Sequence, residues 1–138
     1  MCIRDRLRII FLDLYNDFEN YINHRNNTST TRKEDLTHRF YTLMMDNYRE
    51  HKEVIFYADK LHVSSKYLSE VVKETSGKSP KDWIIDYSLL EIKELLKNSS
   101  LNIQEITIRT KFLNQSALGR FFKRHTNMSP SEYRESTY

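Results

Sequence analysis

Apolar residues recur three and four positions apart along most of the chain, which is the spacing of amphipathic α-helices. The first such stretch lies within residues 1–22, and the polar residues 23–35 that follow predict a linker. A helix beyond a linker must bury its apolar stripe. We therefore expect it to fold back on the rest of the chain, to form a homodimer, or to be the remnant of a sensor and dimerisation domain. The stripe consists of Leu7, Ile10, Phe11, Leu14, Phe18, Tyr21 and Ile22.

Residues 36–135 have the pattern of an all-α domain in which two helix-turn-helix units are joined by a long helix. We expect the first unit at about residues 54–77, the linker helix at about 80–98 and the second unit at about 103–126. Local signals mark these boundaries, because Ser and Asn suit helix N-caps and Pro suits the first helical position. The boundary residues are Ser64 or Ser65, Gly77, Ser79, Pro80 and Asn114.

The ends of the two units repeat the same residues. The string KETSGKSPKDW begins at Lys73, and KRHTNMSPSEY begins at Lys123, 50 positions later. Asn127 stands in the place of Gly77, and Asn is the next-best residue for a left-handed helix end. Two copies at this period indicate an internal duplication rather than a solenoid.

The second unit carries basic residues without acidic ones. No Asp or Glu occurs from Arg109 to His125, and a wholly cationic helix face repels itself unless an anion neutralises it. An ordinary solvated face usually mixes both signs, so we predict a polyanionic partner. In the first unit Lys66 and Lys73 alternate with Glu70 and Glu74, which predicts weaker or more selective phosphate binding.

Helical spacing indicates which side chains of each second helix face outward. If Leu118, Phe121 and Phe122 are buried, Gln115 and Arg120 point away from the core, and these side chains suit adenine and guanine edges in a major groove. Gly119 either permits a close approach to DNA or reflects drift. Glu70 either accepts a hydrogen bond from cytosine or forms an ion pair with Lys66 or Lys73.

The predicted linker helix has a length that suits two DNA-binding units. Its 19 residues from 80 to 98 would span about 28 Å. Successive major-groove segments on one face of B-DNA lie about 34 Å apart. We expect both recognition helices to enter one face of a duplex, although the same length would also suit a helix that only supports the core.

Composition excludes several other classes of protein. The 138 residues suit one domain or two small ones, and the presence of only two Gly and two Pro favours helices. Cys2 is the only cysteine, so no internal disulfide or thiolate metal cluster is expected. The five His show no metal-binding spacing, and there is no glycine-rich phosphate loop, so we predict neither an enzyme nor a cofactor. Without an apolar membrane span or a signal peptide, we expect a cytoplasmic protein.

Three stretches resemble the AraC/XylS-type transcriptional regulators: YADKLHVSSKYLSEVVKETSGKSPKDWI, LLEIKELLKNSSLNIQEI and FLNQSALGRFFKRHTNMSPSEYR. The resemblance implies a seven-helix domain that binds double-stranded promoter DNA and usually activates transcription through contact with RNA polymerase. It also implies that LRIIFLDLYNDFENYI is the closing helix of a sensor domain. By position, it implies base contacts from Lys66, Ser69, Glu70, Gln115, Ser116, Gly119 and Arg120. It implies phosphate contacts from Ser64, Lys73, Lys81, Lys123, Arg124 and Ser129.

The chain departs from the family pattern in its second unit. Thr107 replaces the usual Ala, Lys111 replaces the Gly of the turn, and Ala117 and Leu118 replace larger aromatic residues. The Thr107 hydroxyl then needs a hydrogen-bond partner, and Lys111 must adopt a backbone that glycine prefers. We therefore expect the second unit to be less stable or atypically docked. A helical protein-interaction adaptor or an RNA-binding module is the alternative to the regulator.

Overall fold

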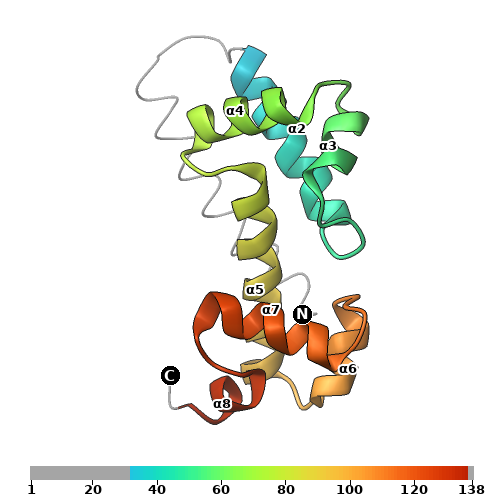
Figure 1. Cartoon of the computed structure of the whole chain (residues 1–138), viewed down its shortest axis with the longest axis vertical. Coiled ribbons are helices and arrows are strands. Elements are labelled where there is room, and N and C mark those ends of the chain that lie inside the picture. Colours follow the sequence, from blue (N-terminus) through green and yellow to red (C-terminus); the bar gives the residue numbers. More distant parts are fainter. Residues whose placement is uncertain (1–31, 137–138) are drawn as a thin grey trace. The chain divides into compact units, whose positions relative to one another are not determined.

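The computed structural model describes residues 32–136, which form seven α-helices and no strand (Figure 1). The predicted all-α class is confirmed for this part of the chain. The helices are α2 (Arg32–Asn47), α3 (Val54–Lys60), α4 (Ser65–Ser76), α5 (Pro80–Asn98), α6 (Ile103–Arg109), α7 (Gln115–Thr126) and α8 (Pro130–Glu135).

The first described helix begins earlier than predicted. Residues 32–35, expected to end a linker, form the first turn of α2 instead. This turn carries Glu34 and Asp35, and acidic residues stabilise a helix N-terminus through its dipole. The predicted helix within residues 1–22, and residues 23–31 of the predicted linker, lie outside the described residues.

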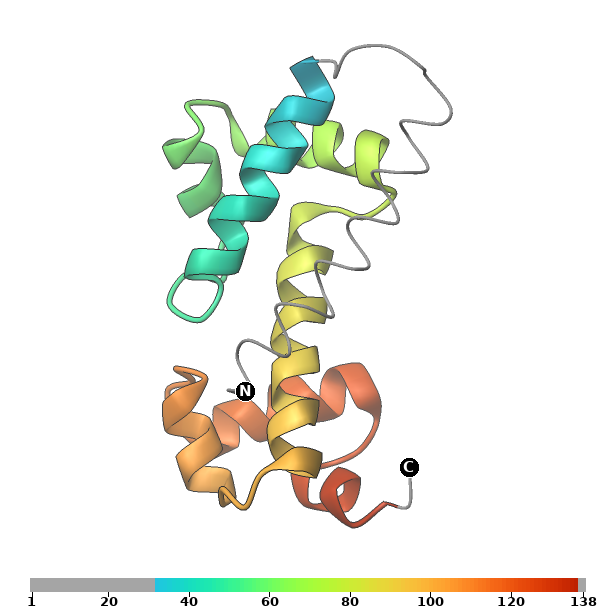
Figure 2. The same ribbon diagram turned by 180° about the vertical axis from the view of Figure 1, so that it is seen from behind.

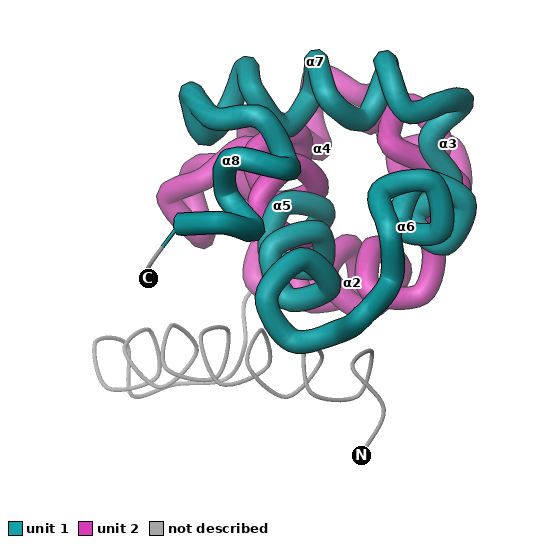
Figure 3. The backbone as a smooth tube through the Cα atoms, turned by 90° about the horizontal axis from the view of Figure 1, so that it is seen from below, with its two compact units in different colours: residues 1–7, 88–138 teal, residues 8–87 magenta. Residues whose placement is uncertain are grey.

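The chain divides into two compact units, shown in different colours in Figure 3. Unit 2 covers residues 8–87 and is described from residue 32. Unit 1 contains residues 88–138 and is described up to residue 136. Each unit holds one helix-turn-helix, α3–α4 in unit 2 and α6–α7 in unit 1.

Unit 2 has its core where α2 packs against both α3 and α4, as seen from behind in Figure 2 with α2 in cyan. Phe40 of α2 and Tyr57 of α3 meet edge to face, with ring centroids 5.4 Å apart. Edge-to-face pairs are a favoured aromatic arrangement, and they add to the stabilisation from burial alone. Leu68 and Val72 of α4 complete this core and are fully buried.

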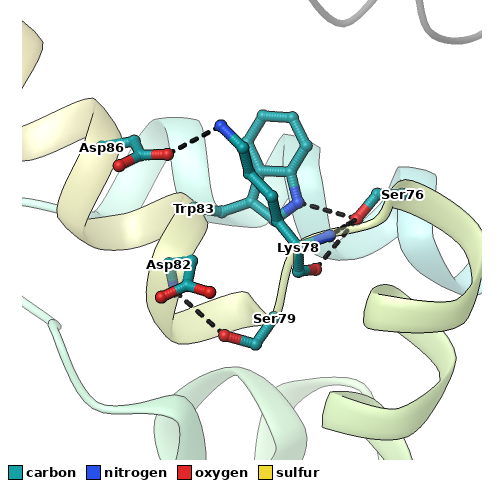
Figure 4. A network of polar contacts seen from close by, with 6 residues as sticks. All are labelled: Ser76, Lys78, Ser79, Asp82, Trp83 and Asp86. Carbon is teal, nitrogen blue, oxygen red and sulfur yellow. Dashed lines mark hydrogen bonds and ion pairs between the residues drawn. The ribbon is translucent and has the colours of Figure 1, made fainter.

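The junction of α4 and α5 is held by a network of polar contacts (Figure 4). The Trp83 indole N–H donates to Oγ of Ser76 at 2.9 Å, and the Ser76 hydroxyl donates to the Val72 carbonyl at 2.6 Å. Lys78 forms an ion pair with Asp86 at 2.7 Å, and its ammonium group lies 5.1 Å from the centroid of the Trp83 ring. The end of α4 is therefore bonded to the first turns of α5.

Unit 1 has its core between α6, α7 and α8, where Ile106, Leu118 and Phe122 are fully buried. Phe121 was expected to be buried with them, but it is only partly covered. Leu118 and Phe122 are four residues apart and share one face of α7, which places Phe121 at the edge of that face. Its ring contacts Phe112, with centroids 5.1 Å apart.

The end of α5 is tied to α8. Arg134 donates from Nε to the Leu96 carbonyl at 2.9 Å and from Nη2 to the Leu95 carbonyl at 3.3 Å. The last carbonyls of a helix have no partner within the helix, so these bonds stabilise the C-terminal end of α5. No helix between residues 32 and 136 has the length and hydrophobicity to cross a bilayer.

Candidate nucleic-acid interface

The two helix-turn-helix units close their turns with the same backbone bond. In unit 2 the Val63 N–H donates to the Ala58 carbonyl at 3.0 Å, and in unit 1 the Phe112 N–H donates to the Thr107 carbonyl at 3.2 Å. Each turn also contains a residue in the left-handed region, His62 with φ 58° and Lys111 with φ 63°. The turn position expected for Lys111 is confirmed, and His62 occupies the matching position in unit 2.

The buried Thr107 hydroxyl is satisfied within its own helix. Its Oγ1 donates to the Ile103 carbonyl at 2.7 Å, while the side chain is only 2% exposed. The expected hydrogen-bond partner therefore exists, and the turn of unit 1 closes like that of unit 2. A lower stability of unit 1 stays a prediction.

The second helix of each helix-turn-helix, α4 in unit 2 and α7 in unit 1, begins and ends in the same way. Ser64 Oγ accepts from the Tyr67 N–H at 3.0 Å, and Asn114 Oδ1 accepts from the Ala117 N–H at 2.8 Å, so each caps its helix. Gly77 and Asn127 end the two helices with φ of 83° and 63°, the left-handed conformation that the sequence predicted. Caps at both ends satisfy backbone groups that would otherwise be unpaired.

The duplication extends to a pair of hydroxyl groups that the sequence analysis did not identify. Ser76 Oγ donates to the Val72 carbonyl, and Thr126 Oγ1 donates to the Phe122 carbonyl at 2.7 Å. Each hydroxyl also lies within hydrogen-bond distance of the carbonyl two residues later, at 3.0 Å and 3.1 Å respectively. The sequence signal that could have identified these hydroxyl groups is their shared position, one residue before Gly77 or Asn127.

The candidate base-contacting residues of α7 lie on its surface, with one exception. Gln115, Ser116 and Arg120 are exposed, while Gly119 is partly covered. No atom lies within 4 Å of the place that a Cβ would take at Gly119, so packing within the chain does not require a glycine there. The Gln115 amide donates to Oε1 of Gln104 at 2.8 Å. This bond joins α7 to α6 and orients the Gln115 side chain.

On α4, the candidates Lys66, Glu70 and Lys73 are exposed and Ser69 is half-buried. Within residues 32–136, Glu70 forms no ion pair with Lys66 or Lys73, so that alternative is not realised. Glu74 instead pairs with Lys33 of α2 at 3.1 Å. Glu70 therefore keeps its acceptor oxygens available at the surface.

Three further phosphate candidates differ in accessibility. Ser64 and Lys81 are exposed, whereas Ser129 is half-buried. The Ser129 hydroxyl caps α8 by accepting from the Glu132 N–H at 3.1 Å. Each serine oxygen accepts one backbone N–H of a helix cap, and its hydroxyl hydrogen can donate to a phosphate oxygen.

The helix-turn-helix of unit 1 carries five exposed basic side chains, on α6, on α7 and on the turn between them. In the described part of the chain, none of its five exposed basic side chains forms an ion pair. These residues, which we name the cationic surface, are Arg109, Lys111, Arg120, Lys123 and Arg124. The described residues also contain no group of His, Cys, Asp and Glu side chains that could hold a metal ion.

Comparison with known proteins agrees with this arrangement. A family model described as "Helix-turn-helix domain" matches residues 57–136. The chain is also 32% identical over 77 residues to the uncharacterised HTH-type transcriptional regulator YobQ of Bacillus subtilis. The chain belongs to the AraC/XylS-type helix-turn-helix family. The match covers 56% of the chain but only 32% of YobQ, so the chain spans about a third of that relative.

Solved structures of AraC-type domains share the fold. The C-terminal domain of AraT, a response regulator from Geobacillus stearothermophilus, has a TM-score of 0.67 and 25% identity. The similarity covers 78% of this chain and 93% of that domain. The DNA-binding domain of AdpA, solved in complex with a target DNA, has a TM-score of 0.62 and 23% identity over 71% of this chain and 88% of the AdpA domain.

Proposed function

We propose that this chain binds double-stranded DNA in a sequence-specific manner and regulates transcription, with α4 and α7 as recognition helices in the major groove. The single observation that carries the proposal is the cationic surface on α6 and α7. These cations repel one another unless an anion neutralises them, and DNA phosphates supply that charge. The AdpA domain, which shares the fold, was solved with target DNA.

The candidate residues then have two roles. Side chains on the outward face of each recognition helix contact base edges, and flanking hydroxyl and basic side chains contact phosphates. The proposed base contacts are Lys66, Ser69, Glu70, Gln115, Ser116, Gly119 and Arg120. The proposed phosphate contacts are Ser64, Lys73, Lys81, Lys123, Arg124 and Ser129.

Activation is the proposed mode of regulation. Two relatives are named as activators, RhaS of Escherichia coli and the lactose operon transcription activator of Staphylococcus xylosus. We propose that this chain acts in the cytoplasm and contacts RNA polymerase, and that a homodimer forms through the helix predicted within residues 1–22. The separation of the two recognition helices by one groove repeat stays a prediction from the length of α5.

The alternative, a protein-interaction adaptor or an RNA-binding module, is less favoured. The deep, narrow major groove of A-form RNA does not admit an α-helix, and sequence-specific RNA recognition mostly uses unpaired bases stacked on aromatic side chains. The outward positions Gln115, Ser116 and Arg120 of α7 are polar or cationic, and the rings of Phe121 and His125 lie against each other, with centroids 4.9 Å apart. The family is one of DNA-binding domains, which are not enzymes.

Selection from random duplexes tests the proposal. The purified chain is incubated with random double-stranded DNA, bound molecules are amplified, and binding to the selected duplex is measured at several salt concentrations. We expect a common sequence to emerge and the affinity to fall linearly with salt on logarithmic axes. Single-stranded DNA and duplex RNA of the same sequence are the controls. Equal affinity for all three nucleic acids would contradict the proposal.

A further inference from the structure

The turn of unit 1 contains one residue more than the turn of unit 2. Four residues, Leu61–Ser64, separate α3 from α4, whereas five, Thr110–Asn114, separate α6 from α7. The backbone bonds that close the two turns are donated by Val63 and by Phe112, so these two residues hold equivalent positions. In unit 2 the N-cap follows Val63 directly, but in unit 1 Leu113 stands between Phe112 and the cap. Leu113 is therefore the inserted residue.

The Leu113 side chain is not packed in the core of the fold. It is 91% exposed, more than Ile108 at 63% or any other large hydrophobic residue in the described part. Packing at this turn comes from Phe112, whose ring contacts Phe121. A residue before an N-cap often contacts the fourth helical residue, here Leu118, but a side chain so exposed does not make that contact.

If α7 is a recognition helix, as proposed above, Leu113 lies next to the end of α7 that meets DNA. Recognition helices contact base edges with their N-terminal residues. Asn114 caps α7, and Gln115 begins its first turn. A side chain from the residue before the cap would then lie beside the bases that Gln115 contacts.

The chemistry of the groove identifies the group that a leucine would contact. Base edges in the major groove present hydrogen-bond donors and acceptors, and the C5-methyl of thymine is the apolar exception. We propose that Leu113 contacts the methyl group of one thymine and thereby selects thymine over cytosine at that position. This inference rests on the proposed function and concerns the same interface.

Deoxyuridine substitution tests the contact, because it removes only the methyl group of thymine. Each thymine of the selected duplex is replaced in turn, and binding is measured for the full chain. We expect one replacement to weaken binding about fourfold, the effect of exposing one methyl group. Leu113→Ala should bind the unmodified duplex about as weakly and should be insensitive to that replacement.

Two controls separate the outcomes. Ile108→Ala also removes an exposed apolar side chain of unit 1 and should keep the sensitivity to deoxyuridine. Replacing the thymine with 5-methylcytosine should restore part of the affinity lost with cytosine, because it restores the methyl group.

If the deoxyuridine effects are identical in the original chain and in Leu113→Ala, the contact does not exist, while the proposed function stands because the duplex still binds. If Leu113→Ala lowers transcription activation but not DNA binding, the residue contacts a protein and the inference is wrong. Failure to select any duplex would overturn both the inference and the proposed function.

Discussion

Trp83 at the start of α5 donates its indole N–H to the hydroxyl of Ser76, the last residue of α4, at 2.9 Å (Figure 4). In unit 1 the matching positions, 50 residues later, hold Thr126 and Tyr133. Tyr133 packs its ring on Phe122, with centroids 5.4 Å apart. The junctions after the two recognition helices thus share the hydroxyl but differ in the aromatic side chain.

A double-mutant cycle on Trp83 and Ser76 measures the contribution of this bond. Trp83→Phe and Ser76→Ala should each lower the free energy of unfolding, and their effects should be coupled by about 0.5–1.5 kcal/mol, the net value of one hydrogen bond. Chemical denaturation of the four proteins gives the coupling. Thr126→Ala combined with Trp83→Phe is the control and should show additive effects.

Replacing Lys111 with glycine should stabilise the fold. Lys111 has φ 63°, and a non-glycine residue in this region lowers the stability of the fold by about 1 kcal/mol. Glycine removes this strain, but it also increases the conformational entropy of the unfolded chain, which offsets part of the gain in stability. We expect Lys111→Gly to raise the free energy of unfolding by about 0.5 kcal/mol or more. Lys111→Ala removes the same side chain without relieving the backbone, so a gain of the same size in this control would contradict the explanation.

Arg120→Ala should change base preference. Arg120 is exposed on the outward face of α7, and an arginine that contacts a guanine edge contributes about 1–3 kcal/mol of discrimination at one base pair. Binding to duplexes that vary at one position at a time checks this. A uniform loss across all sequences would place Arg120 at a phosphate instead.

Lys123→Ala should weaken binding to all sequences alike. A lysine that contacts a phosphate contributes about one unit to the slope of log affinity against log salt. We expect the slope for Lys123→Ala to be shallower by about one unit, as measured by salt titration. Glu135→Gln, which changes one exposed charge outside the recognition helix, is the control; an unchanged slope for Lys123→Ala would remove it from the phosphate contacts.

Tyr57 should make stability fall at alkaline pH. Burial, and secondly the negative charge of Glu53, raise the pKa of the Tyr57 phenol above its ordinary value of 10.0. Above that pH the unfolded chain loses this proton while the folded chain keeps it, so stability falls as pH rises further. Tyr57→Phe should make the decline less steep. At neutral pH it should cost about 1 kcal/mol, because the Tyr57 hydroxyl donates to the His51 carbonyl at 2.6 Å.

Denaturation of both proteins across the alkaline range checks this expectation. Tyr67→Phe is a matched control that removes an exposed phenol from the same unit. An identical decline in the original chain and in Tyr57→Phe would show that another group titrates.

Most of the candidate interface could be predicted because its signals are local. The outward positions of α4 and α7 follow from helical spacing, and Lys66, Glu70 and Arg120 lie exposed as expected. The interactions of Glu74 and Gln115 could not be predicted. Their partners, Lys33 and Gln104, lie 41 and 11 residues away and approach only through packing between helices.

Apart from the start of α2, the sequence alone determined where the described helices lie. Pro80 begins α5, and Gly77 and Asn127 end their helices in the left-handed conformation, because capping and backbone preferences act within a few residues. Tertiary structure decided which of the outward side chains are held by contacts within the chain. Glu74 is held by an ion pair, Phe121 is only partly buried and Leu113 is 91% exposed, since these outcomes depend on how the helices pack together.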